Sequence, residues 1–75
     1  MTIRLNGEPY EIAAPLTISD LLASLDIDHR RVAVEHNLIV IKRERYDTTV
    51  VDNGDEIEIV NLVGGGGRER VKGKG

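Results

Sequence analysis

The sequence contains no cysteine, no tryptophan and no phenylalanine, and these absences narrow the classes of protein to which it can belong. Without cysteine the chain can form no disulfide, no thiolate metal site and no cysteine nucleophile. No apolar run approaches the ~20 residues that a membrane-spanning helix needs, and no segment resembles a signal peptide. We therefore expect a cytoplasmic protein without a membrane partner.

The length of 75 residues allows one small domain. A chain of this size buries only about 60% of its unfolded surface, so the core is modest and leaves little volume for a pocket. Because Tyr10 and Tyr46 are the only aromatic residues, the core must consist mainly of Ile, Leu and Val. No acid–base pair or nucleophile constellation is present. These features favour a carrier or binding module over an enzyme.

The charge is unevenly distributed along the chain. Residues 68–75 carry four Lys or Arg and one Glu, a net charge of +3, whereas the whole chain has −3, which leaves −6 for residues 1–67. An acidic body is repelled by phosphate, so we do not expect nucleic acid as a partner. The basic residues 68–75, called the basic tail below, are typical of a solvated chain end.

The pattern of apolar residues predicts an α+β fold with one helix packed across one face of a mixed sheet. The pair Asn6-Gly7 indicates a type I′ hairpin turn, and Thr17 is a natural helix N-cap with Asp20 three residues later. The first and last strands are expected side by side in the sheet centre. The predicted elements are strands at 1–5, 10–13, 31–35, 38–41 and 56–62, and a helix from Ile18 that ends near Ile27.

The last strand has two different faces. Alternation places Ile57 and Ile59 on the core face and Glu58, Val60 and Leu62 on the other. An exposed apolar pair beside an acidic residue would suit docking of a partner protein. The alternative is burial of Val60 and Leu62 against residues 39–41.

The run Gly64-Gly65-Gly66-Gly67 follows this strand directly. Glycine loses the most backbone entropy on ordering and has no side chain to bury, so the run predicts a flexible thread that leaves the domain. It lacks the Gly-Lys-Ser/Thr ending of a phosphate loop. A plain linker stays open as an alternative. We interpret residues 1–63 as the domain and 64–75 as a flexible glycine-rich thread with a basic tail.

Two histidines and several carboxylates could suggest a metal or catalytic site. His29 and His36 have no cysteine or acidic cluster beside them in the sequence, and we interpret them as surface residues. Asp52, Asp55 and Glu56 are interpreted, with Glu58, as an acidic surface. We expect no bound metal.

Several segments together resemble a known family. The sequence is similar to the ThiS family of sulfur carriers in four segments: residues 3–7, 19–22, 32–35 and 51–60, the last followed by the glycines. This family belongs to the ThiS/MoaD superfamily and has the ubiquitin-like β-grasp fold. The similarity covers residues 1–67. It implies a β-grasp domain with a reactive C-terminal glycine.

The resemblance also implies the chemistry and the partners. A ThiF-like adenylyltransferase draws Gly64 and Gly65 into its active site. It adenylates the carboxyl of Gly66 or Gly67 with the ATP and Mg²⁺ that it binds. Sulfur then converts the adenylated carboxyl to a thiocarboxylate. A ThiG-like thiazole synthase then accepts the sulfur for thiamine. The carrier itself binds no cofactor.

This chain departs from the family pattern because the basic tail follows the glycines. A peptidase could remove the tail, the tail could come from cloning, or sulfur transfer could be lost and only binding retained. A carrier for molybdopterin or cysteine synthesis, and a non-catalytic β-grasp interaction module, are the alternative functions.

Overall fold

The computed structural model describes residues 1–62 and 68–70. The described part of the chain contains one α-helix, two single-turn 3₁₀ helices and eight strands. In chain order they are β1 (Thr2–Leu5), β2 (Glu8–Glu11), β3 (Leu16–Thr17), α1 (Ile18–Ser24), η1 (His29–Arg31), β4 (Val32–His36), β5 (Ile39–Ile41), η2 (Arg43–Arg45), β6 (Val50–Val51), β7 (Glu56–Leu62) and β8 (Arg68–Arg70).

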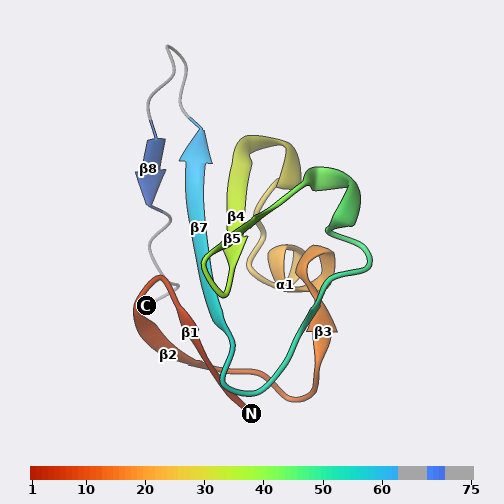
Figure 1. Ribbon diagram of the computed structural model, residues 1–75, viewed down its shortest axis with the longest axis vertical. Coiled ribbons are helices and arrows are strands. Elements are labelled where there is room, and N and C mark those ends of the chain that lie inside the picture. The colour runs from red at the N-terminus through yellow and green to blue at the C-terminus, as the bar shows by residue number, and fades with distance from the viewer. Residues whose placement is uncertain (63–67, 71–75) are drawn as a thin grey trace.

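The main sheet has the order β2-β1-β7-β4-β5, and β8 pairs with β7 beyond the end of β1. β1 and β7 run parallel, and the other neighbours are antiparallel. β3 and β6 form a separate two-stranded ladder. Helix α1 packs across one face of the main sheet (Figure 1). The prediction of an α+β fold with a mixed sheet and central first and last strands is therefore confirmed.

The β1–β2 hairpin and the start of α1 follow from local sequence. Asn6 and Gly7 have φ angles of 50° and 83°, the left-handed pair that a type I′ turn requires. The Thr17 side chain accepts a hydrogen bond from the Asp20 backbone N–H, as an N-cap does. Both local predictions are confirmed.

The hydrophobic core lies between α1 and the sheet and consists almost entirely of aliphatic side chains, as the scarcity of aromatic residues predicts. No polar or charged side chain among the described residues is buried. The buried residues are Ile3, Leu5, Ile12, Ile18, Leu21, Leu22, Val32, Val34, Tyr46, Val51, Ile57 and Ile59.

Some boundaries differ from the prediction. Helix α1 ends at Ser24, before Ile27, because Asp26 adopts a φ of 57° that ends a right-handed helix. Arg31 belongs to η1, so β4 begins one residue later than predicted. No strand was predicted at 68–70, since a three-residue segment of Arg-Glu-Arg has no apolar periodicity.

Candidate functional site

The predicted reactive end lies between two paired strands. β7 ends at Leu62 and β8 begins at Arg68, so the four glycines fall in the connection between them. Residues 63–67 and 71–75 lie outside the described part of the chain. The predictions for Gly64, Gly65, Gly66 and Gly67 therefore concern residues outside it, and they stay predictions.

The three predicted docking residues do share one face of β7. Ile57 and Ile59 are fully buried on the helix side, whereas Glu58 and Val60 are half-buried on the opposite side and Leu62 is 44% exposed. Across the sheet, Glu58 lies opposite Glu35 and Val60 opposite Ala33. The outer face beside the glycines is thus part acidic and part apolar, and its role in docking stays a prediction.

The alternative of burial against β5 fits only in part. Ile39 is 65% exposed and therefore does not shield Val60 or Leu62. Leu62 and Ile41 instead line the same shallow hollow beside η2, together with Tyr46. Burial raises the pKa of the Tyr46 phenol. Leu62 thus lies at the rim of a hollow, where part of its side chain stays accessible.

The β4–β5 turn carries an apolar patch that the sequence did not assign. Leu38, Ile39 and Val40 are 77%, 65% and 61% exposed. Leu38 has a φ of 70°, which is costly for a residue with a branched side chain and fixes it at the tip of the turn. The available signal was an apolar run directly after a polar turn, but a continuous run does not indicate which face points inward.

His36 and Asp55 lie in hydrogen-bond contact, and both side chains are more enclosed than the interpretation of them as surface residues implies. His36 Nε2 lies 2.8 Å from Asp55 Oδ2, and each side chain is only 21% exposed. The Asp52 backbone N–H and the Asn37 side chain also donate to Asp55. Burial alone would raise the pKa of Asp55, but these hydrogen bonds outweigh it and lower the pKa. Asp55 therefore holds the turn before β7 against the β4–β5 turn.

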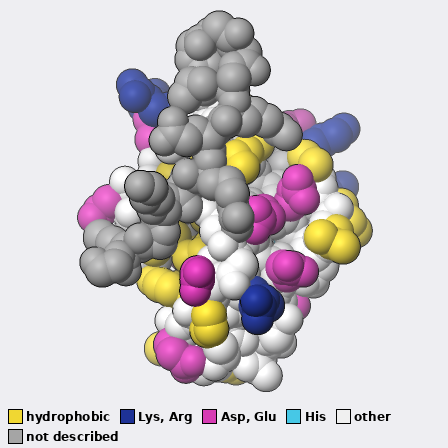
Figure 2. Space-filling model, turned by 90° about the vertical axis from the view of Figure 1, so that its left-hand side faces the viewer, with side chains coloured by type: hydrophobic (Ala, Val, Ile, Leu, Met, Phe, Trp, Pro, Cys, Tyr) yellow, Lys and Arg dark blue, Asp and Glu magenta, His cyan; other side chains and the backbone are white. Residues whose placement is uncertain are grey.

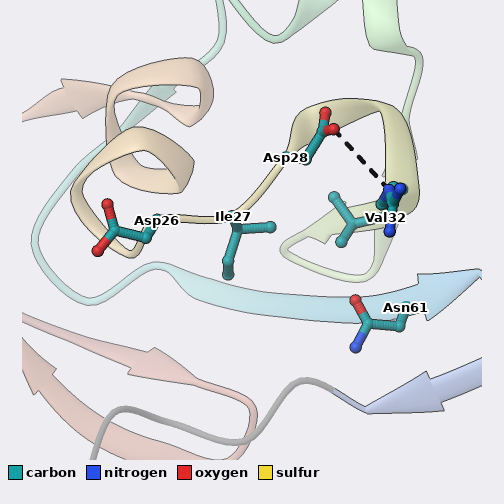
Figure 3. Close-up of a pocket in the computed structure, with 6 residues that line it drawn as sticks. Asp26, Ile27, Asp28, Val32 and Asn61 are labelled. Carbon is teal, nitrogen blue, oxygen red and sulfur yellow. Dashed lines mark ion pairs between the residues drawn. The ribbon is translucent and has the colours of Figure 1, made fainter.

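A second hollow lies on the helix side of the sheet, between the end of α1, η1 and the end of β7. Figure 3 shows Ile27 and Val32 between Asp28 on one side and Asn61 on the other. The Asp28 carboxylate accepts hydrogen bonds from the Arg30 side chain and backbone, which hold the pKa of Asp28 well below its usual range. Because these charges pair with each other at the surface, they fix the η1 turn and provide no free reactive group.

The described residues contain no cluster of three or more His, Cys, Asp or Glu side chains that could hold a metal ion. No described helix is long and apolar enough to cross a bilayer. What residues 1–62 and 68–70 offer is a β-grasp body in which β7 leads directly into a run of glycines. That combination defines the class: a small ubiquitin-like β-grasp protein with a glycine-rich segment after β7.

Similarity to known proteins specifies the class further. The ThiS family model matches residues 3–66, so the chain belongs to the ThiS family. The sulfur carrier protein ThiS of Bacillus subtilis is 48% identical over 65 residues, which cover 85% of this chain and 98% of that protein. The crystal structure of the thiamine biosynthesis protein ThiS of Geobacter metallireducens superposes with a TM-score of 0.79 at 36% identity, covering 88% of this chain and 100% of that chain.

Longer relatives match as well. The thiazole synthase of Paramagnetospirillum magneticum is 41% identical over 66 residues, which cover 88% of this chain. This chain spans only 20% of that protein's length. The thiazole synthase of Magnetococcus marinus shows the same arrangement at 42% identity. The resemblance of the sequence to the ThiS family and the β-grasp fold is thus confirmed.

Proposed function

We propose that this chain is a sulfur carrier for the thiazole ring of thiamine, with its reactive carboxyl on Gly66 or Gly67. The observation that carries the proposal is where the family similarity ends. The ThiS family model stops at residue 66, within the glycine run. The Bacillus subtilis sulfur carrier is covered over 98% of its length by 65 residues. A family model that ends within the glycine run supports a reactive carboxyl on Gly66 or Gly67.

The chemistry assigned here follows the family resemblance. A carboxylate is a poor electrophile, so a partner adenylyltransferase first joins it to AMP from ATP and releases pyrophosphate. A sulfur nucleophile then attacks the acyl carbon, AMP leaves, and the carboxylate becomes a thiocarboxylate. The use of ATP agrees with the predicted cytoplasmic location.

The relatives support a thiazole synthase as the second partner. In two organisms a segment similar to this chain makes up 20% of a protein named thiazole synthase. When two proteins are joined in one chain, each has an effective concentration of about 1 mM at the other. Such a fusion would favour direct transfer of sulfur from the carrier to the synthase. The names of the relatives also favour thiamine over molybdopterin or cysteine synthesis.

The carboxyl must be free before it can react. In the sequence given, residue 67 or 68 is bonded to it, so the proposal requires a peptidase or another origin of the free end. The alternative of a non-catalytic interaction module has one observation in its favour, because Arg68–Arg70 pair with β7 as an added strand.

The deciding experiment uses three proteins: the chain ending at Gly66, the chain ending at Gly67 and the full chain. Each is incubated with the adenylyltransferase of the source organism, ATP, Mg²⁺ and a sulfur donor, and its intact mass is measured. We expect one shortened chain to gain the mass difference between sulfur and oxygen, and the full chain to stay unchanged. If neither shortened chain is modified, the sulfur carrier proposal is wrong.

A further inference from the structure

The edge of β7 that faces β1 changes its partner halfway along the strand. β1 pairs with β7 only through Arg4↔Glu56 and Leu5↔Ile57. At the next position the Asn6 side chain replaces a strand: Asn6 Oδ1 accepts from the Ile59 N–H at 2.7 Å, and Asn6 Nδ2 donates to the Ile59 carbonyl at 3.1 Å. The ladder with β1 therefore ends at Ile57, and the Asn6 side chain occupies the edge at Ile59. The edge of residues 60–62 is left for another strand.

In this structure β8 occupies that edge. The pairs are Val60↔Arg70, Asn61↔Glu69 and Leu62↔Arg68, in antiparallel order. Figure 1 shows β8 beside the upper half of β7, beyond the end of β1. Backbone groups alternate between the two edges of a strand. Since Ile57 and Ile59 bond toward β1, the backbone N–H and carbonyl of Asn61 face β8.

The strand that fills the edge lies outside the family similarity, which ends at residue 66. A chain that ends at the glycines lacks β8, and the edge at 60–62 is then uncovered. An uncovered strand edge is a template for pairing with another extended chain. The proposed carrier form therefore carries a pairing site that the full chain fills with its own residues.

The charge around this edge indicates what it accepts. Glu35 and Glu58 lie directly opposite each other on the neighbouring strands, and like charges in that position destabilise a sheet. Figure 2 views the side on which β8 lies and shows more acidic than basic side chains there. The strand that pairs with this edge has the sequence Arg-Glu-Arg and belongs to a tail of net charge +3. A basic strand lowers the electrostatic repulsion of the acidic sheet.

We propose that the β7 edge at residues 60–62 is a strand-addition site for an extended, basic segment of a partner protein. Arg68–Arg70 fill this site within the full chain, and a partner fills it when the chain ends at the glycines. In such recognition the backbone hydrogen bonds supply affinity and the side chains supply specificity. The inference rests on the proposed function in one respect, since a partner can fill the edge only in the chain that ends at the glycines, whereas the site itself needs no adenylation or sulfur.

The first test examines whether β8 covers Asn61 in the full chain. Glu69→Pro removes the backbone N–H that can donate to Asn61, and Lys74→Pro is the matched control in the same tail. We expect the Asn61 amide to exchange with solvent roughly three- to tenfold faster in Glu69→Pro. The Ile59 amide, held by Asn6, is expected to stay unchanged in both variants. Equal exchange of Asn61 in the parent and Glu69→Pro would overturn the assignment.

The second test supplies the strand from outside. The chain of residues 1–66 retains the whole core, and the Geobacter metallireducens relative, fully covered by 88% of this chain, folds as the same β-grasp. A peptide of residues 68–75 is titrated into it, and amide shifts are followed by NMR up to about 1 mM, the effective concentration that a short linker provides.

We expect saturable shifts at Asn61 and Leu62 that weaken as salt is added. A control peptide exchanges each Arg or Lys for Glu and the Glu for Lys, and we expect at least about tenfold weaker binding from it. Three results would each overturn the proposal: no shift at these residues, equal binding of both peptides, or dimerisation of the shortened chain through the same amides. The last would assign the edge to a second copy of the chain.

Discussion

The two halves of β7 differ in their neighbouring strands and in the burial of their apolar side chains, although they belong to one strand. Residues 56–59 have β4 on one side and β1 followed by the Asn6 side chain on the other, and Ile57 and Ile59 are fully buried. Residues 60–62 keep β4 on one side, receive β8 on the other, and end in the half-exposed Leu62. The first half anchors the fold, and the second leads to the glycine segment.

This difference shows how a small domain can present a reactive chain end without losing stability. The core is closed by residues up to Ile59, so changes beyond that position remove little buried apolar surface. Local stability is expected to fall along β7 in the same direction. The proposed reactive glycines therefore follow a strand that grows less constrained toward them.

The largest expected effect is the loss of Ile57 from the buried half. Ile57→Ala leaves a cavity under α1 and is expected to lower the free energy of unfolding by about 2–5 kcal/mol, measured by urea denaturation. Leu62→Ala in the exposed half is the matched control, with a loss of about 0.5 kcal/mol. Similar losses in the two variants would contradict the division of β7 into two halves.

Most of the first half of β7 was predictable from the sequence, and the reasons are local. Strict alternation at Ile57 and Ile59 identified the core face, and the turn before β7 was visible as Asp-Asn-Gly-Asp. Each of these signals lies within a few residues of the feature that it predicts. The placement of β1 beside β7 was expected instead from the order of the elements, with one helix packed across a mixed sheet.

The second half was less predictable because its partners are distant in sequence or have no pattern. β8 pairs through backbone groups, which the side-chain sequence does not reveal. The carboxamide of Asn6 bonds to Ile59, 53 residues away, although Asn6 was interpreted only as a turn residue. The hydrogen bond between His36 and Asp55 likewise joins the end of β4 to the turn before β7, and these two segments come together only after folding.

A middle-sized effect is expected at Asp55, which fixes the start of the first half. The lowered pKa means that the folded state binds the proton of Asp55 less readily than the unfolded chain does. The charged carboxylate of Asp55 therefore makes its full contribution to the free energy of unfolding above about pH 4, which is near the usual pKa of Asp. That contribution is lost as the pH falls through the lower pKa of the folded state.

Asp55→Asn tests this contribution with a side chain of the same shape. We expect the variant to be less stable than the parent by about 1–3 kcal/mol at neutral pH, because hydrogen bonds to a charged group are lost. The difference in the free energy of unfolding between parent and variant, measured by urea denaturation, should shrink as the pH is lowered from about 5 toward about 2, the range around the usual Asp pKa. Asp47→Asn, at an exposed aspartate outside this turn, is the control. A difference that stays constant over that range would show that the charge of Asp55 does not matter.

The smallest effect on stability is expected at Glu58, where the two halves of β7 meet. Glu58→Lys replaces one of two like charges opposite each other, so the free energy of unfolding should stay equal or rise by a few tenths of a kcal/mol. Association with the adenylyltransferase should slow and lose its dependence on salt if the acidic face guides encounter. Glu8→Lys, on β2, makes the same charge change on a strand that β1 separates from β7, and it serves as the control. If both variants bind at the same rate, net charge alone explains the effect, and the outer face of β7 has no special part in docking.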